Sequence, residues 1–142
     1  MKSVHKTAIL EYSAGKMYAL VEDIGKYPEF LPWCSRTLAA QENETVLATM
    51  YIDFHGLKYS FSTRNRNRPD ESITLELVKG PFNHLDGKWT FTPLGEERSR
   101  VDLVMNYEFS NRLLEKLLAP VFDMVSITLV DSFRERAKAV YG

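Results

Sequence analysis

The chain has 142 residues, of which 44% are hydrophobic and 12% aromatic. This length and composition predict one domain with a single hydrophobic core, spanning residues 1–142. With 18 basic and 19 acidic residues the net charge is -1, which argues against a dedicated DNA-binding protein. The single cysteine, Cys34, excludes an internal disulfide and a zinc site built on cysteine pairs.

The chain carries no sign of secretion or of a membrane span. Residues 1–6 hold charges where a signal peptide needs an apolar stretch. The charge-free run Met124–Val130 is far shorter than the roughly 20 apolar residues that cross a bilayer. We therefore expect a cytoplasmic protein, at most peripheral at the inner membrane.

The N-terminal third is a strand followed by short helices. Residues 3–12 alternate imperfectly between apolar and polar, as a first strand does. Ser13 precedes an apolar helical face and can cap a short helix. Pro28 and Pro32 then limit residues 27–34 to one or two helical turns.

From about residue 35 to residue 109 apolar residues recur at every second position, which predicts strands. Turn residues interrupt the rows at Gly56, 68–70, 79–81 and 93–97. With the first strand this makes about seven strands, and the short connections require antiparallel neighbours.

Residues 111–141 form a long amphipathic helix. Phe122, Val125, Leu129 and Phe133 recur at steps of three and four. Ser110 or Asn111 can cap its start, and Pro120 predicts a kink or break between a lead-in at 113–118 and the main helix.

These elements predict an α+β fold in which a curved antiparallel sheet of about seven strands grips a long C-terminal helix. The apolar face of the sheet and the apolar stripe of the helix must bury each other, and the wedge between them is a natural cavity for an apolar ligand. Plain core packing is the more usual explanation for any one of the candidate lining residues, and for the set as a whole the two explanations weigh equally. The candidates are Phe30, Trp33, Phe54, Phe61, Phe82, Trp89, Phe91, Met105, Tyr107, Met124 and Phe133.

Catalytic and metal-binding patterns are weak. Cys34 is more typical of a packed residue than of a nucleophile, and His5, His55 and His84 lack metal-ligand spacing. His84 and Asp86 share one strand face and can form an acid/base pair, although an exposed polar face gives the same pattern. We predict no catalytic residue, no metal site and no required cofactor.

Arg64, Arg66 and Arg68 fall on one face of a strand and form a candidate patch for an anionic partner. The alternative is an ordinary solvated outer face, because the net charge gives no global support for an anionic partner.

Three separated motifs carry a family resemblance. They are Tyr27–Cys34 (YPEFLPWC), the turn Gly80-Pro81-Phe82 with the strand that follows it, and the C-terminal segment from Phe133 to Gly142. With these motifs the chain resembles the coenzyme Q-binding START-domain family. Bacterial members of that family are also named ribosome association toxin and oligoketide cyclase/lipid transport protein.

The resemblance implies a helix-grip, START-like fold with an apolar cavity and a lipid-like ligand, with ubiquinone as the leading candidate and a supporting role in respiration. We expect non-enzymatic binding of this ligand, transient membrane contact, and a cavity entrance bordered by residues 30–33 and 80–82. The toxin name implies an alternative, binding to a ribosomal subunit through the three arginines. The cyclase name implies a second alternative, polyketide cyclisation, for which His84 and Asp86 would have to face inward.

Overall fold

A computed structural model describes all 142 residues as seven strands, two α-helices and one 3-10 helix. The chain begins with β1 (Lys2–Leu10), α1 (Ala14–Glu22) and the 3-10 helix η1 (Ile24–Glu29). Six strands follow, namely β2 (Cys34–Glu42), β3 (Thr45–Phe54), β4 (Leu57–Arg68), β5 (Ser72–Lys79), β6 (Phe82–Gly95) and β7 (Arg98–Phe109). The long helix α2 (Arg112–Tyr141) ends the chain, and no helix is both long and apolar enough to cross a membrane.

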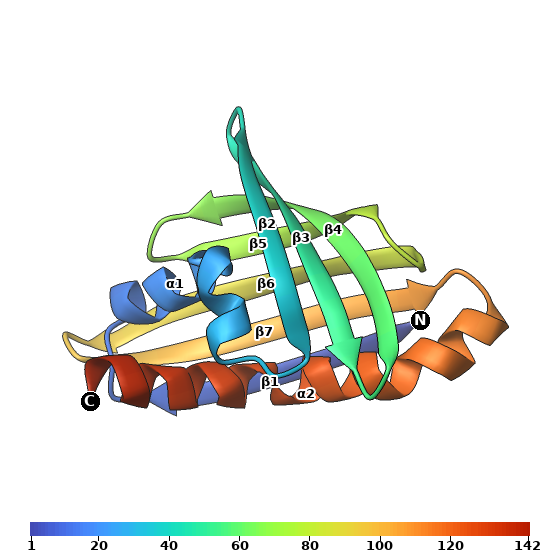
Figure 1. Cartoon of the computed structure of the whole chain (residues 1–142). Helices are drawn as coiled ribbons and strands as arrows, with labels where there is room; N and C mark the ends of the chain where they lie inside the picture. Colours follow the sequence, from blue (N-terminus) through green and yellow to red (C-terminus); the bar gives the residue numbers. More distant parts are fainter.

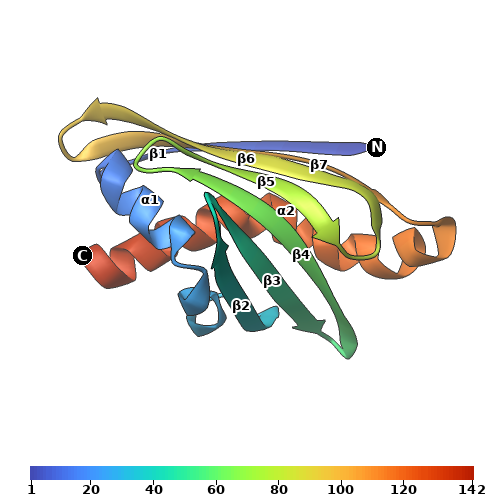
Figure 2. The ribbon, with the colours of Figure 1, turned by 90° about the horizontal axis from the view of Figure 1, so that it is seen from above.

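The strands form one antiparallel sheet in the order β1-β7-β6-β5-β4-β3-β2. Only β1 pairs out of sequence order, with Lys2 opposite Tyr107 on β7. The sheet is curved, and α2 runs along its inner side with α1 beside the C-terminal half of α2 (Figures 1 and 2). The predicted α+β architecture is confirmed.

The helices begin where the sequence supplies a capping side chain. The Ser13 hydroxyl accepts a hydrogen bond from the Lys16 amide, and the Asn111 side chain accepts one from the Leu114 amide. Each cap satisfies one of the free N–H groups in the first turn of its helix. Of the two candidates for the second cap, Asn111 is the one used.

Of the kink or break predicted at Pro120, the break is wrong, because α2 is one continuous helix from Arg112 to Tyr141. The first turns of α2 run at an angle to the rest of the helix (Figure 1). A proline removes a single backbone hydrogen bond. Buried residues on both sides, Leu118 and Phe122, pack into the same core and hold the two halves together.

Two aromatic clusters fill the core between the sheet and α2. The Phe122 cluster consists of Phe61, Phe82, Tyr107, Phe109 and Phe122, with the Phe122 and Tyr107 rings 4.7 Å apart. The Phe133 cluster consists of Tyr27, Phe30, Trp89 and Phe133, with ring centroids 5.2 to 5.4 Å from Phe133. Such edge-to-face pairs contribute about 0.5–1.5 kcal/mol each beyond area burial. The clusters fix two separate stretches of α2 against the sheet.

Candidate ligand-binding cavity

A cavity lies between the sheet and α2, on the stretch of helix between the two aromatic clusters. Its atom-free space, including the open mouth, is about 760 Å³. Ligand pockets have mostly apolar walls with a few polar groups, and this lining is of that kind. Nineteen residues line it, fourteen of them hydrophobic, and α2 contributes Phe122, Val125, Ser126 and Leu129.

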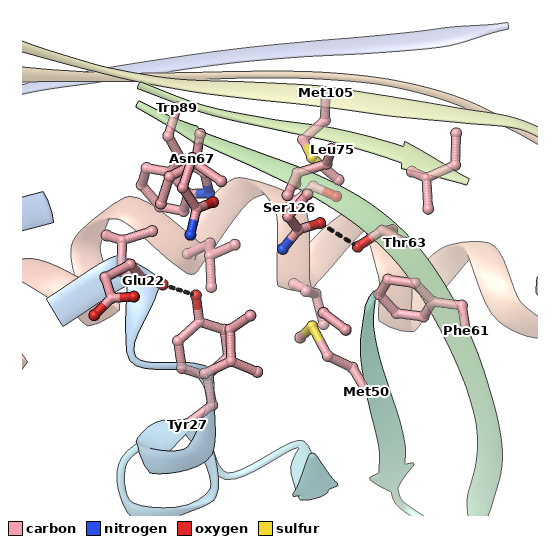
Figure 3. Close-up of a pocket in the computed structure, with 18 of the residues that line it drawn as sticks. Glu22, Tyr27, Met50, Phe61, Thr63, Asn67, Leu75, Trp89, Met105 and Ser126 are labelled. Carbon is pink, nitrogen blue, oxygen red and sulfur yellow. Dashed lines mark hydrogen bonds between the residues drawn. The ribbon is translucent and has the colours of Figure 1, made fainter. Parts of the chain in front are cut away.

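The walls come from every layer of the fold. Trp89, Leu75 and Met105 form the sheet side, while Tyr27 from η1 and Met50 from β3 lie across from them (Figure 3). The two methionines are flexible side chains that adapt to irregular apolar ligands. The cavity therefore offers an apolar, deformable surface to a ligand.

Strand β4 changes the character of one wall from apolar to polar. Its inward positions are Phe61, Thr63, Asn65 and Asn67, all of which line the cavity. Successive side chains of a strand alternate between the two faces of the sheet. The arginines at 64, 66 and 68 consequently lie on the outer face of the same strand.

Hydrogen bonds within the protein pair only some of the polar side-chain atoms in this wall. The Thr63 hydroxyl donates to Asn65 Oδ1 at 2.6 Å, and both residues are buried. The Ser126 hydroxyl donates to the Phe122 carbonyl at 2.9 Å. Asn67 Oδ1 is buried and has no hydrogen-bond partner. Buried polar atoms are nearly always paired in native proteins, so this oxygen is an exception among the polar groups of the wall.

The lining contains no lysine, arginine or histidine. Its ionisable groups are Glu22, which is exposed, and Tyr27, whose hydroxyl donates to the Val21 carbonyl. Burial raises the pKa of Tyr27 above its usual value, so the phenol is neutral. Any formal charge at the cavity is thus the Glu22 carboxylate.

Three of the eleven predicted ligand-binding residues, Phe61, Trp89 and Met105, line this cavity. Of the other eight, five pack in or beside the aromatic clusters, Tyr107 among them. Phe82 stacks on Phe109 in the Phe122 cluster, Phe30 and Phe133 contact each other, and Phe91 lies next to Trp89. None of these side chains is among the lining residues.

The other three candidates and Tyr107 are not in the lining either, although Tyr107 belongs to the Phe122 cluster. Trp33 is almost fully buried in the core, and Phe54 packs on His55 at the end of β3. Tyr107 donates a hydrogen bond to Asp123, which also pairs with Lys2 at 2.8 Å. Met124 is partly buried on α2 outside the lining. The ligand-contact role of all eleven residues stays a prediction.

The predicted entrance segments do not line the cavity either. In residues 30–33, Leu31 and Trp33 point into the core. At the 80–82 turn, a Cβ on Gly80 would lie 2.7 Å from Phe61 Cβ, so the turn is closed by tight packing. The exposed Glu22 at the end of α1 marks the rim instead.

The candidate chemical groups lie away from the cavity. Burial raises the pKa of the Cys34 thiol to about 11, so the thiolate nucleophile is absent at neutral pH. His84 and Asp86 form a hydrogen bond, but the pair is half exposed on the outer face of β6. The cyclase alternative requires this pair to face inward, and the structure places it facing outward.

The three arginines share the outer face of β4, as the alternation predicts. Arg64 pairs with Glu42 at 3.2 Å and Arg68 with Glu71 at 3.8 Å. Arg66 is exposed and forms no ion pair. Arg66 is therefore the arginine of this patch whose charge is fully available to a partner.

Comparisons with known proteins agree on the family. A family model described as polyketide cyclase/dehydrase and lipid transport matches residues 10–134. The chain is 38% identical over 143 residues to the ribosome association toxin RatA of Vibrio cholerae, covering all of this chain and 99% of the relative. It is 27% identical to a mitochondrial coenzyme Q-binding protein COQ10 homolog B of Xenopus laevis, covering 96% of this chain and 58% of that protein.

Solved structures match the fold. An 18 kDa protein of Caulobacter crescentus is 32% identical, with a TM-score of 0.77 over 100% of this chain and 99% of that one. The Zhui aromatase/cyclase from Streptomyces superposes with a TM-score of 0.84 at 16% identity, over 96% and 93% of the two chains. At that identity the second likeness concerns the fold alone, which is the helix-grip arrangement that the resemblance implied.

Proposed function

The chain belongs to the polyketide cyclase/dehydrase and lipid transport family, and on this premise we propose that it binds a hydrophobic, lipid-like ligand without turning it over. The observation that carries the proposal is the cavity between the sheet and α2, with fourteen hydrophobic residues among its nineteen. Burying an apolar tail there yields about 25 cal/mol per Å² of area removed from water.

Ubiquinone is the leading ligand in this proposal, with support of respiration as the role. The similarity to a protein named for coenzyme Q binding supports it. So does the chemistry of the cavity, which pairs apolar walls with amide groups that can bind the oxygen atoms of a ring.

Native mass spectrometry after gentle purification from a quinone-producing host tests the proposal. We expect a stoichiometric prenyl lipid, identified after organic extraction. A protein that is empty, and stays empty after incubation with ubiquinone in detergent, contradicts it.

Contact with a membrane would give access to such a ligand, and α2 offers a surface for it. Leu113 and Leu117 are 67% and 54% exposed near the start of α2, next to the cations Arg112 and Lys116. Exposed leucines beside basic residues favour the surface of anionic bilayers. Flotation with vesicles containing anionic lipid should be lost in Leu113→Asp/Leu117→Asp. Equal flotation of this variant contradicts the contact.

A second candidate function is association with a ribosomal subunit, as relatives named ribosome association toxin suggest. The unpaired Arg66 on the outer face is the observation that favours it. Binding to RNA phosphates weakens with salt, with a log–log slope of about -0.7 to -0.9 per phosphate contacted.

Sedimentation with purified ribosomal subunits at several salt concentrations tests this candidate. Arg66→Gln should weaken binding and reduce the salt slope by about one. Arg134→Gln is the matched control, because Arg134 pairs with Asp131 on α2. If the slope is the same in both variants, Arg66 does not contact the ribosome.

A further inference from the structure

We infer that the outer face of the sheet binds single-stranded RNA, with an unpaired base stacked against Tyr51. The Tyr51 surface consists of the outer sides of β3 and β4 around Tyr51, together with Arg36 on β2 and Lys79 on β5. The inference rests on the second candidate function, ribosome association, since it names the RNA chemistry and the residues of that contact. It is independent of the cavity between the sheet and α2.

Tyr51 presents an aromatic ring on the outer face beside a cation. It lies opposite Ser60 on β4 and opposite Arg36 on β2. Phe61 is buried in the core, so the neighbouring Ser60 and its partner Tyr51 face outward. The Arg36 guanidinium lies 5.3 Å from the centre of the Tyr51 ring. Aromatic rings and guanidinium planes are the groups on which unpaired bases stack in proteins.

Two open hollows adjoin Tyr51, and both are lined by Tyr51 and Ser60. The first also includes hydroxyl groups of β3 and β4 and the turn at 79–81, and the second includes side chains near the β3–β4 turn. Only two of the eight lining residues in the first and three of the seven in the second are hydrophobic. Such polar linings suit the sugar, phosphate and base edges of a nucleotide better than an apolar side chain.

Cations without a carboxylate partner lie around the Tyr51 surface. Arg36, Arg66 and Lys79 are exposed and form no ion pair. Lys79 lines the first hollow and lies opposite Ser62 on β4. Arg66 lies six positions beyond Ser60 on the same strand, roughly 20 Å away. An RNA strand of several nucleotides can therefore place phosphates at all three cations while one base reaches Tyr51.

Carboxylates limit the path that an RNA strand can take. Asp53 near the second hollow pairs with Lys58 at 3.9 Å. Glu76 and Asp86 lie opposite each other on β5 and β6 and are not paired with lysine or arginine. These two carboxylates repel a polyanion from the middle of β5 and β6, so the strand runs along β4.

Double-stranded RNA can use only part of this surface. Its phosphates can meet the same cations, but its bases are stacked on one another and leave no base face open to Tyr51. The Tyr51 surface therefore distinguishes single strands from duplexes.

Fluorescence anisotropy with labelled dodecauridylate, and with a labelled RNA duplex of the same length, tests the inference. We expect Tyr51→Leu to weaken binding of the single strand about five- to fiftyfold and to leave duplex binding within about twofold, because only the stacking is lost. Tyr51→Phe keeps the ring and should bind like the wild type. Lys79→Gln should reduce the salt slope for the single strand by about 0.7, the effect of one phosphate.

The matched control is Tyr141→Leu, which should change neither affinity. Tyr141 is also half-buried with a cation, Lys16, 5.4 Å from its ring centre, but it lies at the end of α2. Three results would each overturn the inference: unchanged binding of dodecauridylate by Tyr51→Leu, equal losses in Tyr51→Leu and Tyr51→Phe, and displacement of the RNA by poly-L-glutamate as readily as by unlabelled RNA at the same concentration of charge.

Sedimentation of the wild type with ribosomal subunits separates this inference from the function on which it rests. If the protein sediments with subunits and does not bind dodecauridylate, the inference fails and ribosome association stands. If it binds neither, both fail.

Discussion

Single atoms of the sheet determine the shape of the cavity, as Gly87 on β6 illustrates. A Cβ at this position would lie 2.7 Å from Met105 Sδ and 3.2 Å from Leu75 Cδ1. Both neighbours line the cavity, so the missing side chain of Gly87 leaves room for them. The glycine is required for its small size here, since its backbone is not in the left-handed region.

We expect Gly87→Ala to push Met105 and Leu75 into the cavity. The substitution should weaken binding of ubiquinone and lower the free energy of unfolding by about 1–3 kcal/mol, the usual effect of overpacking. Gly25→Ala is the matched control, because a Cβ there meets nothing within 4 Å. Titration of both variants with the ligand and their unfolding in urea check the prediction. It fails if the two variants bind and unfold alike.

The reactivity of the Cys34 thiol tests whether this side chain is buried. Its thiol is buried and its pKa is raised to about 11, because burial disfavours the charged thiolate. Since this folded-state pKa lies above that of an unfolded cysteine, the native thiol should react slowly with iodoacetamide up to about pH 9 and rapidly after unfolding. Mass spectrometry of the labelled protein measures both rates, and fast labelling of the native protein would contradict the burial.

At the scale of elements, η1 is held to α2 by contacts between residues far apart in sequence. Glu29 pairs with Arg136 at 2.9 Å, and the Arg136 guanidinium also lies 4.9 Å from the centre of the Phe30 ring. Ile24 and Tyr27 of η1 line the cavity. The ion pair therefore fixes the element that forms one wall.

Arg136→Met should loosen η1 and increase amide exchange at Phe30 and Leu31 about two- to fivefold. The hydrogen bond from Arg136, with a second from Lys26, lowers the pKa of Glu29. A lowered folded-state pKa means that the stabilisation is present above the ordinary glutamate pKa and is lost as the pH falls through the lowered value. Amide exchange at Phe30 and Leu31, measured by NMR, should therefore differ between wild type and variant at pH 7 and be the same in both at pH 3. The control is Arg134→Met, and a difference that persists at pH 3 would exclude the ion pair as its cause.

Over the whole molecule, α2 and the sheet stabilise each other through a few large side chains. Phe133 is 1% exposed and contacts rings from η1, the following loop and β6. Its removal leaves a void that these elements surround and cannot all fill.

Phe133→Ala should lower the free energy of unfolding by about 3–5 kcal/mol. Urea unfolding should show this as a lower midpoint with an unchanged slope. Leu113→Ala, at a position that is 67% exposed, should change the midpoint little. Similar losses in the two variants would show that the packing around Phe133 is not what holds α2 to the sheet.

The sequence predicts the elements better than the cavity. Strand rows and helix caps depend on neighbouring residues, and these predictions are confirmed. Which core side chain touches an empty space depends on packing between distant elements, so Phe82 and Phe133 could not be told apart from Phe61 in advance. The sequence prediction did not include Thr63, Asn65 and Asn67, because the arginines between them pointed to a function of the outer face of the strand only. The strict alternation after Phe61 was the signal that places them inside.

The two faces of β4 also bear on how such a protein changes in evolution. Inward amides and outward arginines occupy alternate positions of one strand, so a point mutation alters one set and leaves the other in place. An insertion or deletion of one residue would exchange the two faces and damage both at once. Descendants of one gene can therefore lose the proposed outer contact and keep the proposed ligand, or the reverse, by substitution alone.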